Sequence, residues 1–484
     1  MRQGWNLENT YLTLPGRFYS LVESNPISEP RSIVFNVPLA KELGLDVESL
    51  QTKSGIEILS GNGFPQGSVP ISQAYSGHQF GHFTTLGDGR ALLIGEQRTP
   101  KNLLFDIQLK GSGPTPYSRR GDGRATIGPM LREYIISEAM NSLGIPTTRS
   151  LSVVGSKDIV YREKPLKAAV LCRVAKSHIR VGTFEFASKL GSLDDLRALT
   201  DYTINRHERE CIENDNPYLE FLKRVIQKQA ILTAKWMLVG FIHGVMNTDN
   251  MSIAGETIDY GPCAFMDTYS PGTVFSSIDE NGRYAYGNQP SVTRWNLAVF
   301  AETLLPLLDE DKMKGIQLAK EALGEFEDLY YQEWFSGMKA KLGLLNEDSE
   351  DKSIIVDLLR LMEENKTDFT YFFSSLTLGN LEGLALFKTG KDKAWKEKWE
   401  KRLDRQIGGK SAGREIMGKT NPWIIPRNID VERVLTAAVD HENYIPVNEL
   451  IEKLSNPFDY SKIGEEQRLP PEKLERQYKT YCGT

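Results

Sequence analysis

Two short polar runs limit how this chain can fold. The first is HGVMNTDN at residues 243–250, and the second is the turn Asp-Tyr-Gly at residues 259–261. Asp249, Asn250 and Asp259 carry side-chain oxygens, the donors that Mg²⁺ prefers when it binds a triphosphate. The chain must therefore fold so that a loop and a nearby turn meet at one metal and nucleotide site.

The spacing of these residues is that of a kinase catalytic loop with one residue changed. A kinase has a His, a catalytic Asp two residues on, a metal-binding Asn five residues further and an Asp-Phe-Gly turn. Here Val245 occupies the position of the catalytic Asp. A valine can neither accept a proton nor orient a nucleophile. The sequence therefore predicts nucleotide binding with a chemistry other than the usual transfer of the terminal phosphate.

Composition sets the class of protein. The chain has 484 residues, with 58 basic and 64 acidic side chains. It has no excess positive charge to neutralise a phosphate backbone, so nucleic acid is not an expected partner. The N-terminus has no apolar signal segment, and no apolar stretch approaches the roughly 18 residues that span a bilayer. We expect a cytoplasmic protein without membrane contact that acts as a monomer.

The pattern before residue 176 predicts the small lobe of an α+β, two-lobed protein-kinase-like fold. Short apolar or alternating runs at 83–86, 91–96 and 105–109 predict a three-stranded antiparallel meander. Apolar residues at helical spacing after Gly128 and Pro129 predict a helix. Two more strands are expected at 151–154 and 168–174. A small β-sheet lobe with one helix is thus predicted for residues 1–175.

The rest of the chain is predicted to form a larger, mainly helical lobe at 176–469 and a flexible tail at 470–484. A long buried helix before the 243–250 loop is indicated by Phe221, Val225, Ala230, Ala234, Met237 and Leu238. Further helices are expected at 293–309, 313–345, 353–364 and 393–405.

Lys110 and Glu133 form a candidate ion pair. Lys110 ends the predicted strand at 105–110, and Glu133 lies early in the helix that follows. In kinases such a glutamate holds the lysine ammonium against the nucleotide phosphates. Surface pairs of this kind are common and contribute under about 1 kcal/mol. The position of the pair between the strands and the metal site favours the functional interpretation.

Two glycine-rich turns carry arginines. The first is Gly87-Asp-Gly89-Arg90, and the second is RRGDGR at 119–124, which contains Asp122 and Gly123. Guanidinium groups bind phosphate oxygens in pairs, which favours an anion site. A tight hairpin turn or a solvated loop has the same composition, so both interpretations stay open.

Arg173 and Arg180 flank the run VAKSHI, at the expected connection between the lobes. In a kinase this segment binds adenine and has no use for two arginines. A polyphosphate lying there would suit them, so the pair indicates a nucleotide bound in the reverse orientation. The alternative is that both arginines pair with surface carboxylates.

His243 is expected to brace its loop. Asp249 is the better candidate for a general base, because a carboxylate beside a metal-binding Asn can reach an incoming hydroxyl. The alternative is that Asp249 completes the metal shell.

The four cysteines, at 172, 211, 263 and 482, include no Cys-x-x-Cys pair. Cys263 follows the Asp259 turn, and Cys482 is third from the end of the chain. These two thiols can close as a reversible disulfide that couples redox state to nucleotide access. For any two cysteines, however, unpaired thiols are the commoner outcome.

Taken together, these residues resemble the selenoprotein O family of protein adenylyltransferases, kinase-like proteins of bacteria and mitochondria. The match runs through most of the chain. It rests on QFGHF at 79–83, LGDGRA at 86–91, QLKGSGPTPYSR at 108–119, RGDGR at 120–124, HGVMNTDNM at 243–251 and DYGPCAFMD at 259–267.

The resemblance implies a bacterial enzyme that transfers AMP from ATP to Ser, Thr or Tyr hydroxyls of proteins, with ATP inverted relative to a kinase. Asp249 would accept the proton, and Asn250 and Asp259 would hold Mg²⁺. The implied ATP contacts are Gly87, Gly89, Arg90, Lys110, Asp122, Gly123, Arg173, Arg180 and Asp259. Cys482 stands where the family has selenocysteine, which puts the strength of redox control in question. The residue types do not distinguish ATP from UTP, or Mg²⁺ from Mn²⁺.

Two other functions remain open. A catalytically dead pseudokinase that binds ATP as a scaffold would explain Val245, but the intact pair Lys110 and Glu133 and the metal ligands argue against it. An atypical kinase would use Asp249 in place of the missing Asp. Arg173 and Arg180 argue against that function, because they crowd the usual adenine site.

Overall fold

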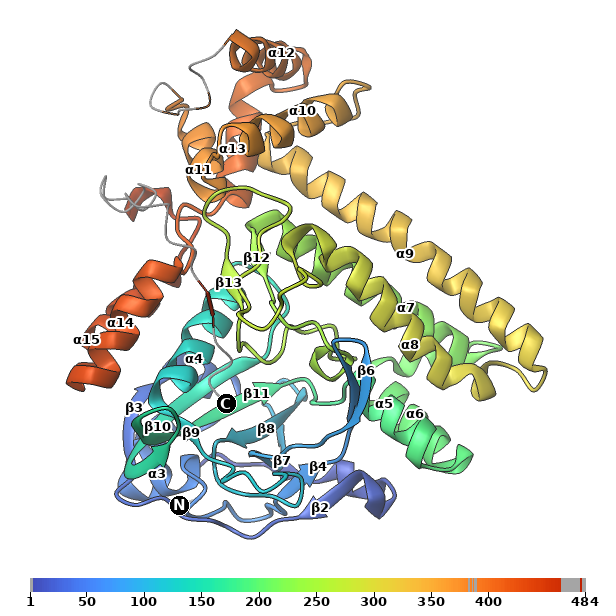
Figure 1. Ribbon diagram of the computed structural model, residues 1–484, viewed down its shortest axis with the longest axis vertical. Coiled ribbons are helices and arrows are strands. Elements are labelled where there is room, and N and C mark those ends of the chain that lie inside the picture. The colour runs from blue at the N-terminus through green and yellow to red at the C-terminus, as the bar shows by residue number, and fades with distance from the viewer. Residues whose placement is uncertain (1–2, 382–383, 385, 387–389, 463–478, 481–484) are drawn as a thin grey trace.

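The computed structural model describes residues 3–381, 384, 386, 390–462 and 479–480. This part of the chain is mixed α and β, with one large antiparallel sheet and many helices (Figure 1). The mixed composition is as predicted from the sequence, and the kinase-like division into two lobes stays a prediction. No helix among the described residues is long and apolar enough to cross a membrane.

The large sheet has nine strands in the described part of the chain. Seven of them follow the order β2-β4-β7-β8-β11-β10-β3, while β1 pairs with β7 and β9 with β11. Their bounds are β1 Leu7–Glu8, β2 Tyr19–Leu21, β3 Arg31–Phe35, β4 Ile71–Gln73, β7 Ala91–Arg98, β8 Leu104–Lys110, β9 Ala125–Thr126, β10 Arg149–Tyr161 and β11 Pro165–Ala175. The predicted strands at 91–96, 105–109, 151–154 and 168–174 are confirmed. The sequence predicted too few strands, because β1 to β4 in the first 73 residues were not among the five that were expected.

The predicted meander is wrong in its first strand. Residues 83–86 do not pair with β7; β6, His82–Thr85, pairs with β5, Ser76–Gln79, in a separate two-stranded hairpin. Phe80 and Gly81 make the tight turn at its tip, with left-handed φ angles of 51° and 88°. Most of β6 is exposed, so this strand has no buried face to hold it against the large sheet.

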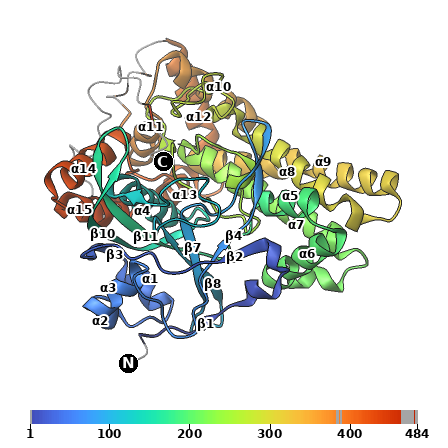
Figure 2. The ribbon, with the colours of Figure 1, turned by 60° about the horizontal axis from the view of Figure 1, so that its bottom comes forward.

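Helices cover both faces of the sheet, because neighbouring residues of a strand point to opposite sides. On one face Val154, Val170 and Cys172 pack with α1 to α3. On the other face Val153 and Leu171 pack with α4. Figure 2 shows α1 to α3 together beside the sheet. These helices are α1 Val37–Glu42, α2 Val47–Leu50, α3 Lys53–Leu59 and α4 Ile127–Ser142, and α4 is the helix predicted after Gly128 and Pro129.

The residues after β11 are mainly helical, with bounds α5 Val181–Leu190, α6 Leu193–His207, α7 Pro217–Val239, α8 Gln289–Leu308, α9 Lys312–Lys341, α10 Asp351–Glu364, α11 Phe369–Leu378, α12 Gly390–Arg405, α13 Gly409–Thr420, α14 Asn428–His441 and α15 Ile445–Leu454. The long predicted helix is α7. The Asn216 side chain caps its N-terminus, and Gly240 ends it with a φ of 72°. The helices predicted at 293–309, 313–345, 353–364 and 393–405 are α8, α9, α10 and α12.

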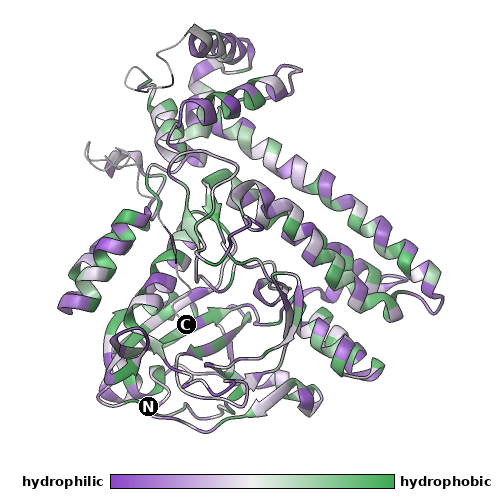
Figure 3. Ribbon diagram, viewed as in Figure 1, coloured by the Kyte–Doolittle hydropathy of each residue, from purple (hydrophilic) through white to green (hydrophobic). Residues whose placement is uncertain are grey.

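The last helices return to the sheet region. Side chains of α14 and α15 join the same buried cluster as α4, including Val434, Val447 and Met130. Figure 3 shows that these outer helices carry both hydrophilic and hydrophobic residues, as expected for helices with one buried face. Of the predicted tail at 470–484, only Lys479 and Thr480 belong to the described residues.

Candidate active site

A short strand pair brings the two polar runs together. β12, Phe241–Ile242, and β13, Ala264–Phe265, are antiparallel, with Phe241 opposite Phe265. The loop after β12 and the turn before β13 therefore meet. His243 is buried, and its Nε2 donates to the Ile258 carbonyl oxygen at 2.9 Å. The expectation that His243 braces the loop is confirmed.

Asp259 lies at the centre of a cluster of cations. Its Oδ1 is 3.0 Å from Lys110 Nζ and 2.7 Å from Arg173 Nη1, and its Oδ2 accepts from Arg180. Asp259 has a left-handed φ of 62°, so the backbone turns sharply where the carboxylate enters the cluster. Burial alone would raise the pKa of Asp259. The charges of Arg180, Lys110 and Arg173 outweigh burial and hold that pKa well below its usual range.

Glu133 holds two of the same cations from the other side. Its Oε2 is 2.6 Å from Lys110 Nζ, and its Oε1 is 3.3 Å from Arg173 Nη1. Arg173 is 1% exposed, so pairing with surface carboxylates, the alternative weighed for it, is wrong. Three cations share the two carboxylates of Glu133 and Asp259. Guanidinium and ammonium groups gathered in one buried place suit an anionic ligand.

Arg180 joins the turn to the loop. Its Nη1 donates to the Asp249 carbonyl oxygen at 2.7 Å as well as contacting Asp259. Its guanidinium carbon lies 4.8 Å from the centre of the Tyr75 ring, in the range of a cation–π contact. Arg180 is itself buried, so surface pairing is wrong for this residue too.

The β5–β6 hairpin covers Asp249. A Cβ on Gly77 would lie 2.5 Å from Asp249 Oδ1, so only glycine allows this approach. The backbone N–H of His78 donates to Thr248 Oγ1 at 2.7 Å, and that of Phe80 donates to Asn247 Oδ1 at 3.1 Å. Sequence reasoning did not place this hairpin at the site, and the small residue Gly77 is the only local signal for it.

Asp249 is in an electrostatic state opposite to that of Asp259. It lies in the short 3₁₀ turn Thr248–Asn250 and is 7% exposed. Burial raises the pKa of Asp249 to about 6, against the opposing charge of Arg180. A carboxylate of this basicity is ionised at neutral pH and is well suited to accept a proton.

Asn250 and Asp259 can supply oxygen ligands to a metal. The Asn250 side-chain nitrogen donates to the Val245 carbonyl oxygen at 3.0 Å, which fixes the amide and leaves its oxygen for another partner. Within the described ranges, no three His, Cys, Asp or Glu side chains form a group that could hold a metal. The Asn250 amide oxygen and the Asp259 carboxylate are of the donor type that Mg²⁺ prefers, and both Asp259 oxygens here contact Lys110, Arg173 or Arg180. Mg²⁺ keeps few protein ligands and takes the rest from phosphates and water.

The first glycine-rich turn lies against residues 111–117, which precede the second turn. The Thr115 hydroxyl donates to the Asp88 carbonyl oxygen at 2.7 Å, and a Cβ on Gly87 would overlap the Tyr117 ring. The Arg90 carbonyl oxygen accepts from the Gly111 N–H at 2.7 Å, directly after Lys110.

The second turn faces a surface arginine. The Asp122 carboxylate receives two bonds from Arg162, at 2.8 and 3.0 Å. Gly123 has a φ of 63° and packs against the Gly113 backbone. The structure thus places the Asp122 carboxylate on Arg162 and not on the Asp259 cluster.

Asp88 is a site residue that sequence reasoning missed. Its place in the turn at 87–90 predicted no role for its side chain, yet Asp88 is 4% exposed. Burial raises the pKa of Asp88 to about 6. Its Oδ2 accepts from Gln108 Nε2 at 3.0 Å, and its Oδ1 lies 3.9 Å from Arg180 Nη2. Asp88 therefore connects the first glycine-rich turn to the cation cluster.

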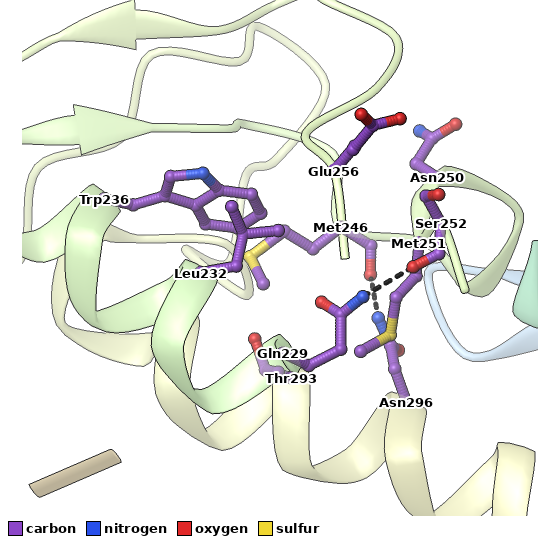
Figure 4. A pocket seen from close by; sticks show the side chains of 10 residues that line it. All are labelled: Gln229, Leu232, Trp236, Met246, Asn250, Met251, Ser252, Glu256, Thr293 and Asn296. Atoms are coloured by element: carbon purple, nitrogen blue, oxygen red, sulfur yellow. Dashed lines mark hydrogen bonds between the residues drawn. The ribbon is translucent and has the colours of Figure 1, made fainter. Parts of the chain in front are cut away.

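Helices α7 and α8 hold the catalytic loop from behind (Figure 4). The Gln229 side chain donates to the Ser252 carbonyl oxygen at 2.6 Å, and Asn296 donates to that of Met246 at 3.0 Å. The cavity between them measures about 10 Å³, about the room that one water molecule needs. This region supports the loop and is too small for a nucleotide.

Of the predicted redox pair, the structure describes Cys263 but not Cys482. Cys263 is buried, and its carbonyl oxygen accepts from Arg132 Nη2 at 2.7 Å. Cys482 lies outside the described residues. Thr480 is described, and its hydroxyl donates to the Pro262 carbonyl oxygen at 2.6 Å. Thr480 thus contacts the residue that precedes Cys263.

Comparisons with known proteins give one consistent family. A family model described as "Protein adenylyltransferase SelO" matches residues 3–455. The chain is 55% identical over 484 residues to "Protein nucleotidyltransferase YdiU" of Alkaliphilus metalliredigens, covering 100% of this chain and 99% of that protein. It is 56% identical over 481 residues to the proteins of that name from Bacillus cereus and Brevibacillus brevis, covering 99% of this chain and 99% and 98% of theirs.

Proposed function

The chain belongs to the family of protein adenylyltransferase SelO, and we propose that it transfers AMP from ATP to Ser, Thr or Tyr hydroxyls of protein substrates. It is an enzyme of the nucleotidyltransferase class. The observation that carries the proposal is the pair of neighbouring carboxylates in opposite electrostatic states. Asp259 is held ionised among cations, whereas burial makes Asp249 basic.

The proposed orientation of ATP is the reverse of that in a kinase. Lys110, Arg173 and Arg180 form one buried cationic group on Asp259. The β- and γ-phosphates carry most of the charge of ATP, so we place them at this group. The α-phosphorus would then lie toward the catalytic loop. We also propose a kinase-like arrangement in which the sheet and α4 form one lobe and the helices after residue 175 form the other.

The proposed reaction is an in-line displacement at the α-phosphorus. The acceptor oxygen forms a bond to that phosphorus, and the bond from phosphorus to the bridging oxygen of pyrophosphate breaks. The hydroxyl proton passes to the Asp249 carboxylate. Pyrophosphate leaves with increased negative charge, which the group of Lys110, Arg173 and Arg180 stabilises. Val245 is compatible with this reaction, because Asp249 supplies the base.

Mg²⁺ bound by Asn250 and Asp259 would neutralise phosphate charge, and Mn²⁺ would suit the same oxygen donors. We propose that Gly87, Gly89 and Arg90 contact ATP through the first glycine-rich turn. We propose that Asp122 and Gly123 contact ATP in one of two ways. Either the Asp122 carboxylate releases Arg162, or the backbone of the turn binds ATP directly. The cytoplasmic location, the monomeric state and the absence of nucleic acid and membrane partners remain predictions from the sequence.

Cys263 and Cys482 are proposed as a reversible disulfide that controls access of ATP. The support is the contact of Thr480, two residues before Cys482 in the sequence, with Pro262, the residue before Cys263. Peptide mapping without reductant should find the linked pair after mild oxidation. Recovery of both as free thiols under those conditions would contradict this proposal.

Incubation of the reduced protein with Mg²⁺ and ATP labelled on the α- or the γ-phosphate tests the main proposal. We expect label from the α-phosphate alone to remain on protein, and none with the Asp249→Ala variant. Label from the γ-phosphate would instead identify an atypical kinase. No label from either, with ATP binding demonstrated, would identify a scaffold.

A further inference from the structure

A cleft of about 710 Å³ lies between the β5–β6 hairpin and the residues that lead into α8. Phe80 and His82, at the tip of the β5–β6 hairpin, form one wall. The other wall comes from the segment that connects β13 to α8 and from α8 itself, and includes Asp279, Arg283 and Trp295. The hairpin and this segment are both visible beside the loop region in Figure 1.

Both walls are fixed to the residue two positions before Asp249. Asn247 Oδ1 accepts from the Phe80 backbone N–H at 3.1 Å and from the Tyr284 hydroxyl at 2.7 Å. The Phe80 and Tyr284 rings also pack together, with centres 5.1 Å apart. A chain lying in the cleft would therefore pass next to the loop that carries the proposed base.

The hairpin wall is also held by the helices beneath it. His78 Nδ1 lies 2.5 Å from Glu185 Oε2, and its ring packs edge-on against Trp295 with centres 5.4 Å apart. The cleft is thus formed by anchored side chains and does not depend on a loose loop.

Arg283 is the available cation of the cleft. Its guanidinium lies over the Trp295 ring at 4.9 Å and over the Tyr284 ring at 5.7 Å. Among the described residues it has no carboxylate within ion-pair distance, and its Nε has no hydrogen-bond partner. The nearest acid in sequence, Asp279, is engaged elsewhere, because its two oxygens accept from the backbone N–H groups of Arg283 and Tyr284 at 2.9 and 2.8 Å.

Glu280 and Ile278 also line the cleft. Ile278 is 55% exposed and offers an apolar contact. Glu280 is also exposed, so water and salt screen its charge more than that of an arginine stacked on two rings. The cleft therefore combines aromatic and apolar walls with one arginine that lacks a carboxylate.

We propose that this cleft binds an extended segment of the acceptor protein, with an acidic residue of that segment paired to Arg283 near the hydroxyl that receives AMP. The inference rests on the proposed function and names the substrate class for the same site. An extended chain fits between two walls, and its backbone and apolar side chains lie along Phe80, Trp295 and Ile278. A carboxylate on Arg283 forms the strong, paired hydrogen bonds that guanidinium groups favour.

The test uses synthetic peptides that carry one Ser, Thr or Tyr in a Gly and Ala background, flanked on either side by Glu or by Gln. Transfer of α-labelled AMP is measured over a range of peptide and ATP concentrations. For the wild-type enzyme we expect the KM for a Glu peptide to be about tenfold lower than for its Gln counterpart. Arg283→Gln should abolish this preference and Arg283→Glu should reverse it, with the KM for ATP unchanged.

Arg294→Glu is the matched control. Arg294 is an exposed arginine of α8 that pairs with Glu327 at 3.6 Å and does not line the cleft. It should keep the preference for Glu peptides.

An equal loss of preference in Arg294→Glu, or a preference that survives in Arg283→Glu, would overturn the proposal. So would labelling of larger proteins by a wild-type enzyme that labels none of the peptides. Failure of the wild-type enzyme to label any protein or peptide from the α-phosphate would instead overturn the proposed function.

Discussion

Asp249 and Asp259 lie in the same site and touch the same arginine, yet their surroundings act on them in opposite ways. Arg180 reaches the carboxylate of Asp259 but only the backbone oxygen of Asp249. Asp259 has two further cations on its oxygens, whereas the Asp249 carboxylate lies under the β5–β6 hairpin with one oxygen lacking a hydrogen-bond partner among the described residues. The pKa of Asp259 is therefore lowered and that of Asp249 is raised to about 6.

This difference separates two roles within a short stretch of chain. A carboxylate with a lowered pKa stays ionised and is a poor base, so it serves as a ligand for cations. A carboxylate with a raised pKa binds a proton more readily, so it serves as a base. Two residues of one type thus acquire opposite pKa shifts from the groups packed around them, which suits them to the two proposed roles.

Replacement of Asp259 should have the largest effect. Asp259→Asn removes the carboxylate that all three buried cations share and leaves Glu133 to Lys110 and Arg173 and the more distant Asp88 to Arg180, so we expect AMP transfer to be lost. The free energy of unfolding should fall by about 3 kcal/mol, the lower end for breaking a buried ion pair, because the Asp259 side chain keeps 22% exposure. Urea denaturation and α-label transfer measure the two effects. Unchanged stability would show that the cation cluster does not depend on this carboxylate.

Asp249→Asn tests the other carboxylate of the pair. Without the base, transfer should fall by about 10²–10⁴ while ATP binding is kept. The pKa of Asp249 is higher in the folded than in the unfolded protein. Its ionisation therefore lowers the free energy of unfolding at pH 8, and this loss is absent below the pKa of the unfolded state. The metal-free variant should thus be about 1–3 kcal/mol more stable than the wild type at pH 8. A loss of stability like that of Asp259→Asn would contradict the difference drawn between the two residues.

Glu133→Gln should have a smaller effect, since it leaves both reacting groups in place. Lys110 loses its partner at 2.6 Å, and we expect the KM for ATP to rise about tenfold, the size of one lost charged hydrogen bond. Glu138→Gln is the control on the same helix, because Glu138 pairs with Arg149 at 2.7 Å outside the site. Equal changes in both variants would assign the effect to α4 in general.

Glu256→Gln should have the least effect on transfer and tests burial alone. Glu256 is buried and accepts from the Lys176 N–H at 2.9 Å, and burial raises its pKa to about 7. Ionisation of Glu256 should lower the free energy of unfolding of the wild type by up to about 3 kcal/mol as pH rises from about 4.5 to about 7. The variant has no carboxyl group at this position, so its stability should lack this decrease. Denaturation curves at pH 5 and pH 8 measure the difference. Parallel pH dependence of the two proteins would contradict the effect assigned to burial.

The elements with strong periodicity could be predicted from the sequence. Strands β7, β8, β10 and β11 and helices α4 and α7 show clear alternating or helical patterns of apolar residues. The short strands β1 to β4 and the hairpin strand β6 could not be assigned correctly. Their pairing depends on distant parts of the chain, and a strand of two to five residues shows too little alternation to reveal its partner.

The site was predicted in its residue types but not in their surroundings. The spacing of Lys110, Asp249, Asn250 and Asp259 pointed to a nucleotide and metal site. That Arg173 is buried, that Asp88 joins the cluster and that Gly77 lies against Asp249 all result from tertiary packing. Burial determines the direction of these pKa shifts, and burial of a single polar residue leaves no mark in a local pattern.

The most direct test of the account is a structure of the reduced enzyme with Mg²⁺ and an ATP analogue in which a methylene group joins the α- and β-phosphorus atoms. The account predicts the γ-phosphate at Lys110 and Arg173, and the α-phosphorus on the side of Asp249. A γ-phosphorus next to Asp249, with adenine near the segment between Arg173 and Arg180, would contradict it.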